Sequence, residues 1–234
     1  MSAGTLYGIG VGPGDPELIT LKAARRITAC GVVASLSTNG QPGLARRIAA
    51  AHIGAHQHEL ALPMPMQATV ERRAQAYDDA VATLVPYLDR GDDVAVLCEG
   101  DPLLYGSFIA IMKRLSLHYR CEVIPGISSI MAGAAAGLVP LAEAQSTFTI
   151  VPATLDAPRL NDVIASADGV AILKLGRHAQ KVRNLLAACG RLDTALYVER
   201  IGQSEGRCQA FADVAPADVP YFALVLSPAP GAPA

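Results

Sequence analysis

Two acidic side chains flank a glycine in the segment Glu99-Gly100-Asp101-Pro102, which directly follows the apolar run Val94-Ala95-Val96-Leu97. Such a run predicts a parallel strand covered on both faces, and ligands gather at the carboxyl ends of these strands. Glu99 and Asp101 would lie at that edge, and Gly100 would let the backbone come close to a bound molecule. An ordinary strand-to-helix turn accounts for the same residues about equally well.

Two other predicted strands also end in glycine-bearing loops. The strand over residues 6–11 runs into Gly12-Pro13-Gly14-Asp15, where Asp15 can cap a helix that begins at Pro16. The strand over residues 121–124 ends in Pro125-Gly126-Ile127-Ser128-Ser129. Ser128 is either a ligand contact or simply the N-cap of a small-residue helix over 130–137.

The glycines of the first loop do not fit a dinucleotide-binding fingerprint. Counted from Gly8 and Gly10, the position of the third glycine is occupied by Pro13. The second predicted strand, Val32-Val33-Ala34, is followed by Ser35-Leu36-Ser37 and not by an acid that could bind a ribose. No Gly-Lys-Ser or Gly-Lys-Thr of a phosphate loop occurs. A nicotinamide enzyme or a nucleotide triphosphatase is therefore not expected.

Metal and disulfide chemistry are not expected either. His52, His56 and His58 are close in sequence, but Gly54 interrupts helical spacing and no carboxylates complete a ligand set, so we expect solvated surface histidines. The five cysteines are scattered and form no Cys-x-x-Cys pair. That pattern argues against both a structural zinc and a disulfide framework.

The elements that must position these loops alternate as in an α/β protein with a parallel sheet. Amphipathic or capped helices are predicted over four stretches: 16–30, 70–88, 104–115 and 178–189. The stretch 38–66 is irregular and predicts turns and loops that could lie over the site. After a change of pattern near residue 140, a second series of strands is predicted over 147–151, 170–173, 196–199 and 221–226. We expect an N-terminal α/β domain over 1–142, a C-terminal α/β domain over 143–227 and a disordered tail over 228–234.

Composition limits the classes of function. The 234-residue chain has 51% hydrophobic residues and a formal net charge of −2. No stretch approaches the roughly 20 apolar residues of a membrane span, and the N-terminus lacks the pattern of a secretion signal, so we expect a cytoplasmic protein. A slightly acidic chain without a dense Lys/Arg run is not expected to bind nucleic acid.

Taken together, the glycine-bearing blocks and several later ones resemble the tetrapyrrole methylase family in order and spacing. The resemblance covers essentially the whole chain and rests on residues 8–16, 99–102, 124–129, 151–154, 173–177, 197–200 and 220–222. It implies two α/β domains with the active site in the cleft between them, S-adenosylmethionine as the methyl donor, and a homodimer. The loop over 202–206 departs from the family pattern.

The resemblance also implies roles for individual residues, carried over by position. Its implied cofactor contacts are Pro13, Glu99, Gly100, Asp101, Leu104, Tyr105, Ser128, Ser129, Leu173 and Ala210. The last of these depends on an alignment gap. A substrate rimmed with acetate and propionate groups requires cations, for which Lys174 and Arg177 are candidates and Arg46 and Arg47 second choices. Each of these cations is also explained as a solvated surface residue.

Within the family, the later blocks most resemble members that methylate precorrin-2 at carbon 20, giving precorrin-3A in cobalamin biosynthesis. Methyl transfer from a sulfonium needs positioning and no enzyme nucleophile, while Asp101 and Glu199 are candidates for a base that removes the proton afterwards. No metal is implied. The alternatives are the cobalt-dependent reaction on cobalt-factor II, members that act on ribosomal RNA or diphthamide precursors, and a non-catalytic tetrapyrrole carrier.

Overall fold

The computed structural model describes residues 2–38, 40–65 and 69–229. The chain divides into two compact units, Met1–Ser128 (unit 1) and Ser129–Ala234 (unit 2), each described by itself below. The predicted tail over 228–234 lies mostly outside the described residues. No helix in the described ranges is long and apolar enough to cross a membrane.

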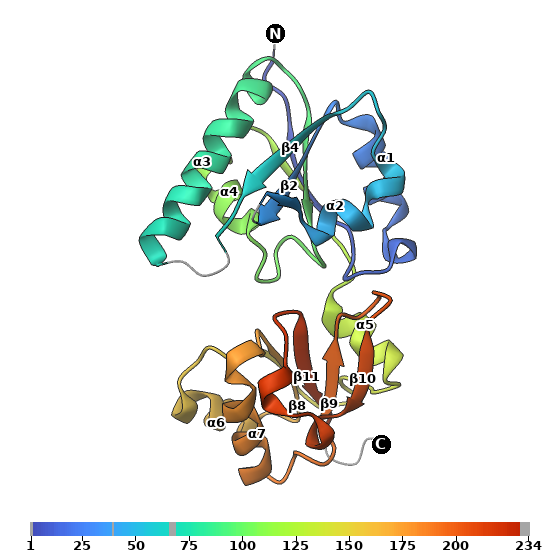
Figure 1. Cartoon of the computed structure of the whole chain (residues 1–234), viewed down its shortest axis with the longest axis vertical. Helices are drawn as coiled ribbons and strands as arrows, with labels where there is room; N and C mark the ends of the chain where they lie inside the picture. Colours follow the sequence, from blue (N-terminus) through green and yellow to red (C-terminus); the bar gives the residue numbers. More distant parts are fainter. Residues whose placement is uncertain (1, 39, 66–68, 230–234) are drawn as a thin grey trace. The chain divides into compact units, whose positions relative to one another are not determined.

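Unit 1 is built on a mainly parallel sheet (Figure 1). Its strands are β1 (Leu6–Gly10), β2 (Val32–Thr38), β3 (Gln41–Pro42), β4 (His58–Pro63), β5 (Val94–Cys98) and β6 (Cys121–Ile124). The order is β3-β2-β5-β1-β6, and β4 pairs in parallel with β2. Only the short β3 runs antiparallel, to the end of β2. Both neighbours of β1 run parallel to it, so β1, β5 and β6 end at the same edge of the sheet.

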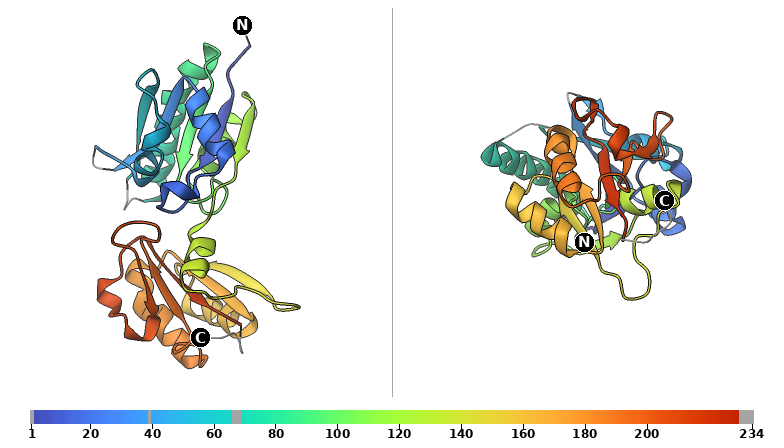
Figure 2. Two further views of the ribbon diagram at one scale, coloured as in Figure 1. Left: turned by 90° about the vertical axis from the view of Figure 1, so that its right-hand side faces the viewer. Right: turned by 90° about the horizontal axis from the view of Figure 1, so that it is seen from below.

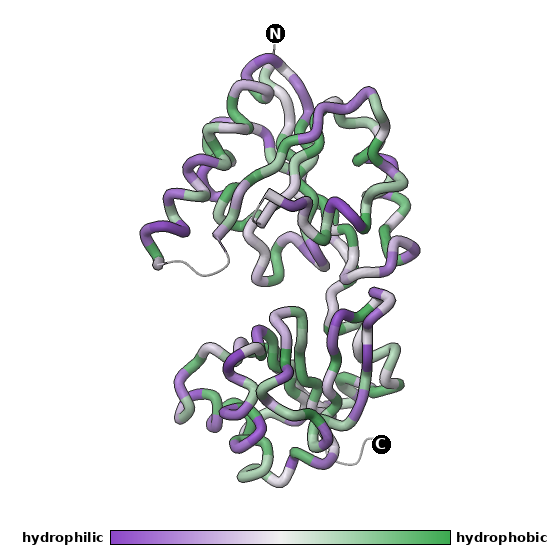
Figure 3. The backbone as a smooth tube through the Cα atoms, viewed as in Figure 1, coloured by the Kyte–Doolittle hydropathy of each residue, from purple (hydrophilic) through white to green (hydrophobic). Residues whose placement is uncertain are grey.

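Helices cover both faces of this sheet, which explains why β1 and β5 are apolar and buried along their whole length (Figures 1 and 2). One face packs on α1 (Leu21–Ala29) and α2 (Leu44–Ile48). The other packs on α3 (Val70–Asp89) and α4 (Phe108–Leu115). Figure 3 shows the hydrophobic positions along the strands and on one side of the helices.

Two predicted helices begin later than expected. Asp15 does cap, accepting from Glu17 N at 2.8 Å, but the turn it starts is a 3-10 helix, Pro16–Leu18, and α1 begins at Leu21. The helix predicted from Leu104 begins at Phe108, because Tyr105 adopts a left-handed backbone with φ 55° that no α-helix contains.

The prediction of irregular structure over 38–66 is wrong. This stretch holds β3, α2, a 3-10 helix (Ala50–His52) and the edge strand β4. Only Leu62 of β4 is fully buried, so the strand lacks the alternating apolar pattern that identifies strands from sequence.

Unit 2 is a mixed sheet with helices on both faces (Figure 2). Its strands are β7 (Phe148–Pro152), β8 (Gly169–Leu173), β9 (Leu196–Glu199), β10 (Arg207–Ala210) and β11 (Ala223–Ser227), in the order β10-β9-β11-β8-β7. Strands β7 and β8 are parallel, whereas β11 runs antiparallel to both β8 and β9. Strand β10 was not predicted. The remaining elements are α5 (Ser129–Ala136), α6 (Ala157–Ser166), α7 (Ala179–Ala188) and 3-10 helices Gly176–His178, Phe211–Asp213 and Pro216–Asp218.

The division between the units falls ahead of the boundary predicted at 142/143. The cause is α5, whose residues pack on the sheet of unit 2. A Cβ added at Gly133 of α5 would lie 3.0 Å from Val198 Cγ2, and one at Gly137 would lie 2.2 Å from Leu196 Cδ2. Small residues on this helix therefore allow it to lie close against β9.

Candidate functional site

The three glycine-bearing loops predicted from sequence begin side by side in unit 1. Gly10 of β1 is in register with Cys98 of β5, and Ile9 is in register with Ile124 of β6. The chain therefore enters all three loops at one edge of the sheet, the carboxyl edge at which α/β proteins bind ligands.

Backbone hydrogen bonds join the first loop to the second. Val11 N donates to Cys98 O at 3.0 Å, and Gly100 N donates to Gly12 O at 2.8 Å, which extends the pairing beyond the strands. Gly100 has φ +63° and Gly12 has φ +81°, both in the left-handed region that favours glycine. The glycines at these positions allow the two loops to turn while they stay paired.

Asp101 joins the second loop to the third. Its Oδ1 accepts from Leu103 N at 2.9 Å, and its Oδ2 accepts from Gly126 N at 3.1 Å. The first bond shapes the turn that Asp101 itself belongs to, and the second reaches a residue that follows β6. Charge-assisted bonds of this kind are stronger than neutral ones, so Asp101 fixes the position of two loops at once.

The loops also pack backbone against backbone. A Cβ added at Gly126 would lie 2.1 Å from Gly100 O, and one added at Gly10 would lie 2.5 Å from Gly126 N. Neither position accommodates any side chain without a shift of backbone. Ser128 is also close, since a Cβ added at Gly100 would lie 3.7 Å from Ser128 Cα.

The remaining residues of the predicted cofactor set in unit 1 lie in or beside these loops. Pro13 is buried. The carboxylate of Glu99 accepts from Ala45 N at 3.2 Å, so Glu99 bonds to the first turn of α2 and not to a neighbouring glycine loop. Leu104 and Tyr105 occupy the turn before α4, where Tyr105 carries the strained backbone noted above. Backbone strain of this kind is concentrated at functional sites.

Exposed apolar side chains lie in the second and third of these loops, which suits a ligand with an apolar ring. Leu103 is 49% exposed, Tyr105 42% and Ile127 37%, while most of the large hydrophobic residues of unit 1 are buried. Polar backbone groups of glycine loops together with exposed apolar side chains are the composition expected of a small-molecule site.

In unit 2 the predicted residues separate into two groups. Ser129 is the first residue of α5. Leu173 is the last residue of β8. Strand β11 pairs with both β8 and β9, and this pairing places the end of β8 at the same edge of the sheet as Glu199, the end of β9. Ala210 pairs with Leu196, at the other end of β9 from Glu199, so the register does not bring Ala210 to the edge where Leu173 lies.

Two cations at this edge of unit 2 have left-handed backbones. Lys174 follows β8 with φ 59°, and Arg200 follows β9 with φ 45°. The sequence predicts Lys174 as a site residue but does not predict Arg200, because no pattern in a sequence reports a positive φ at a non-glycine residue. Arg177 is exposed in the 3-10 helix Gly176–His178 and has no ion pair among the residues the structure describes.

Glu199 is the centre of a charged cluster. It is 6% exposed, and its Oε2 accepts from Tyr197 Oη at 2.8 Å and from Arg207 Nε at 2.7 Å, while Arg200 Nε lies 3.8 Å from Oε1. Burial and the bond to Glu199 raise the pKa of Tyr197, and the bond to Glu199 raises the pKa of Arg207. Arg207 begins β10, so this cluster connects β9 to β10 around the loop over 200–206.

The second-choice cations and one of the three histidines have structural partners. Arg46 forms a two-pronged ion pair with Glu59 at 2.9 and 3.0 Å, and Arg47 donates to Pro42 O at 3.1 Å. His58 stacks on Tyr87 with ring centroids 5.2 Å apart. Over the described ranges, no three His, Cys, Asp or Glu side chains cluster as metal ligands.

Comparison with curated proteins gives relatives over nearly the whole chain. It is 34% identical over 236 residues to the precorrin-2 C(20)-methyltransferase of Sinorhizobium sp., covering 97% of this chain and 96% of that protein. It is 39% identical over 237 residues to the cobalamin biosynthesis protein CobIJ of Mycobacterium tuberculosis, covering 97% of this chain but 47% of that protein. The chain thus spans about half the length of the mycobacterial relatives that it matches. The cobalt-precorrin-2 C(20)-methyltransferase of Salmonella typhimurium is 25% identical over 226 residues, covering 95% of each.

Solved structures share the fold. A cobalt precorrin-4 methyltransferase matches with a TM-score of 0.78 at 22% identity, covering 96% of this chain and 94% of that one. The uroporphyrin-III C-methyltransferase of Thermus thermophilus, in complex with S-adenosylhomocysteine, matches with a TM-score of 0.70 at 24% identity, covering 95% and 96%. Residues 5–209 match the family model of tetrapyrrole (corrin/porphyrin) methylases, and the chain belongs to this family.

Proposed function

We propose that the chain is an S-adenosylmethionine-dependent methyltransferase that methylates precorrin-2 at carbon 20, giving precorrin-3A in cobalamin biosynthesis. The observation that carries this proposal is the near full-length similarity to the Sinorhizobium precorrin-2 C(20)-methyltransferase, at 34% identity. The linked loops of unit 1 support it, since they contain the residues that the family resemblance implies for the cofactor.

S-adenosylmethionine would supply a methyl group on a sulfonium, and the likeness to a methyltransferase in complex with S-adenosylhomocysteine supports this choice of donor. The loop residues proposed to hold it are Pro13, Glu99, Gly100, Asp101, Leu104, Tyr105 and Ser128. From unit 2 we propose Ser129 and Leu173, with Ala210 as a further candidate. Two features support the binding of S-adenosylmethionine here: the glycine backbone of the loops and the exposed apolar side chains of Leu103, Tyr105 and Ile127.

Positioning would carry most of the catalysis, because a departing sulfide needs no protonation. Fixing two reactants in near-attack geometry supplies up to about 7–11 kcal/mol in ideal cases. The loops joined by Asp101 and the paired backbones of Gly12 and Gly100 provide the rigidity for this. Asp101 and Glu199 both stay candidate bases, because each carboxylate is already hydrogen-bonded: Asp101 to Leu103 N and Gly126 N, and Glu199 to Tyr197 and Arg207.

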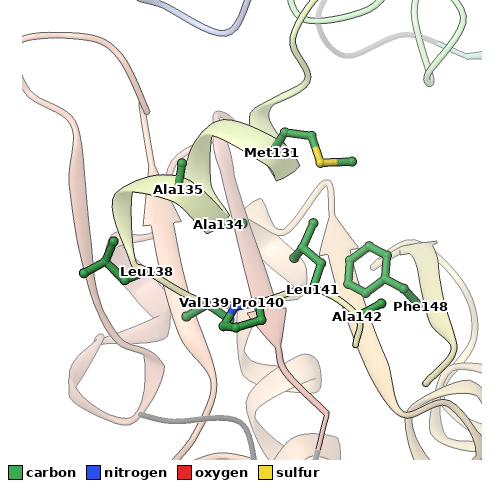
Figure 4. Close-up of a pocket in the computed structure, with 9 residues that line it drawn as sticks. All are labelled: Met131, Ala134, Ala135, Leu138, Val139, Pro140, Leu141, Ala142 and Phe148. Atoms are coloured by element: carbon green, nitrogen blue, oxygen red, sulfur yellow. The ribbon is translucent and has the colours of Figure 1, made fainter. Parts of the chain in front are cut away.

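We also propose that the protein is a cytoplasmic homodimer. An apolar groove of about 630 Å³ on unit 2 supports self-association. Figure 4 shows its lining side chains on α5 and on the segment that follows it, among them Met131, Leu138 and Phe148. Met131 is 55% exposed and Leu138 85%, and exposed apolar patches of this kind mark interaction surfaces.

Mass spectrometry of the macrocycle tests the reaction. The protein is incubated anaerobically with S-adenosylmethionine and either precorrin-2 or cobalt-factor II, so that each substrate controls for the other. We expect one added methyl on the metal-free compound, with one equivalent of S-adenosylhomocysteine. Addition on the cobalt compound alone would favour the reaction named for the Salmonella relative. Binding without methyl transfer to any tetrapyrrole would favour the carrier.

A further inference from the structure

Unit 1 has a hollow at the carboxyl edge of its sheet, apart from the three glycine-bearing loops. The volume of this hollow is about 430 Å³. It lies where β2 and β4 end and α3 begins, and is lined by Ser37, Pro63, Met64, Pro65, Arg72, Gln75, Ala76 and Asp79. Figure 1 shows the end of β4 and the first turns of α3 on the same side of unit 1.

Arg72 is the cation of this hollow. It is the third residue of α3, whose start is fixed by the Thr69 hydroxyl, which accepts from Arg72 N at 3.3 Å. The guanidinium has no ion pair or hydrogen bond within the described part of the chain. Arg46, by contrast, is occupied by Glu59. A guanidinium that lines a hollow and is bound to no protein carboxylate is suited to a carboxylate from a ligand.

Other polar side chains also line the hollow. Ser37 is 4% exposed, and its hydroxyl has no hydrogen bond to any residue that the structure describes, so it can donate to a ligand. Gln75, which also lines the hollow, donates from Nε2 to Asp79 Oδ1 at 2.9 Å. The negative charge of Asp79 would repel a carboxylate placed beside it. The lining therefore offers two donors, Arg72 and Ser37, and one acidic group, Asp79.

The hollow lies beside the proposed cofactor loops in the order of the sheet. Strand β2 pairs with β5, which ends at Glu99-Gly100-Asp101, and with β4 on its other side. At about 4.8 Å between strands, β4 is roughly 10 Å from β5. The glycine loops that follow β1, β5 and β6 therefore lie at the same sheet edge as the hollow. The hollow is lined by the cation Arg72 and by no glycine.

We propose that this hollow is a subsite for one peripheral acetate or propionate of the tetrapyrrole, held by Arg72 with Ser37 as a second donor. The inference rests on the proposed function, since it assigns the substrate side of the same edge. Arg72 acts as a specificity-determining residue that orients the macrocycle, and takes no part in the methyl transfer. Asp79 restricts the subsite to a single carboxylate.

Arg72→Gln tests the subsite, with Arg90→Gln as the matched control. Arg90 follows the other end of α3 and pairs with Asp92 at the protein surface. We expect Arg72→Gln to raise the KM for precorrin-2 about 10-fold or more, because it removes a charge-assisted contact. The kcat and the Kd for S-adenosylhomocysteine stay within about two-fold. Arg72→Lys restores part of the KM, because it keeps the charge and loses the two-pronged geometry.

Binding of uroporphyrin III, measured by fluorescence, provides a readout without turnover, since this porphyrin carries the same acetates and propionates. We expect weaker binding to Arg72→Gln, unchanged binding to Arg90→Gln and equal or tighter binding to Asp79→Asn. Equal KM values and equal porphyrin affinities for Arg72→Gln and Arg90→Gln would overturn the subsite. A wild-type protein that methylates no tetrapyrrole, yet binds uroporphyrin III through Arg72, would overturn the proposed reaction and leave the subsite standing.

Discussion

Asp101 accepts a hydrogen bond from the backbone N–H of Gly126 at 3.1 Å, across 25 residues of sequence. With the bond from Leu103 N at 2.9 Å, this carboxylate holds together the loops that follow β5 and β6. The Asp101 carboxylate thus fixes the backbone of both loops, which is the contribution that we propose for it in a site that works by positioning.

Asp101→Asn tests this role. The amide cannot accept both backbone bonds as the carboxylate does, so we expect the Kd for S-adenosylhomocysteine to rise about 10-fold and kcat to fall. Isothermal titration calorimetry and initial rates measure the two effects. An unchanged Kd with a lost kcat would instead assign Asp101 a role as base only.

The control is Asp93→Asn. Asp93 also accepts a backbone N–H, from Thr5 at 2.8 Å, but lies before β5 at the opposite edge of the same sheet. Because the amide oxygen of Asn can still accept this single bond, we expect a cost below about 1 kcal/mol of unfolding free energy and no change in S-adenosylhomocysteine affinity.

Gly126→Ala is predicted to disturb the site through the backbone alone. Its Cβ would meet Gly100 O at 2.1 Å, so one of the loops must move. We expect a lower melting temperature and at least about 10-fold weaker binding of S-adenosylhomocysteine. Gly31→Ala is the matched control, because a Cβ there has no neighbour within 4 Å. Equal behaviour of the two variants would show that close approach of the loops is unimportant.

Glu199→Gln separates a structural role from a catalytic one. Losing the charge weakens the bond to half-exposed Arg207, and we expect a loss of about 1–3 kcal/mol of unfolding free energy. If Glu199 only connects β9 to β10, kcat measured well below the melting temperature falls less than about 10-fold. Removal of a general base costs about 100-fold or more, and a loss of that size would make Glu199 the base.

Asp168 is expected to make the unfolding free energy of the protein depend on pH in the acid range. Its carboxylate accepts from Thr147 N at 2.7 Å and from Thr147 Oγ1 at 2.9 Å, and these bonds hold its pKa below the ordinary value. A lowered pKa in the folded state contributes stability above the unfolded pKa, and this stability is lost as pH falls through the folded pKa. Asp168→Asn should therefore reduce the pH dependence of unfolding below about pH 4, measured by urea titration. An unchanged slope would contradict this assignment.

Much of the fold was predictable because its central strands are buried on both faces. The runs that form β1 and β5 contain no charged residue and are buried along their whole length, and a glycine stands two residues after the end of each strand. Strand β4 could not be predicted, since it lies at the edge with one fully buried residue, Leu62. Because β4 was not predicted, the hollow at its end could not be predicted either, nor could the role that we infer for Arg72.

The residues of the candidate site could be selected from the sequence by type and order, but their contacts could not be predicted. Residues such as Gly100 and Asp101 stand out as turn and ligand residues at a strand end. The bond from Gly126 to Asp101 depends on which strands are neighbours, and a local pattern does not contain that information. The same holds for Glu199, whose partner Arg207 is set by the antiparallel register of β9 and β10.

Methylation of precorrin-2 at carbon 20 is the reaction that we propose for this chain. Carbon-13 NMR of the product formed from S-adenosylmethionine with a ¹³C-labelled methyl group tests it most directly. The proposal predicts one labelled methyl, bonded to the meso carbon 20 of a metal-free macrocycle. A labelled methyl at any other carbon, or none in a protein that still binds S-adenosylhomocysteine, would contradict it.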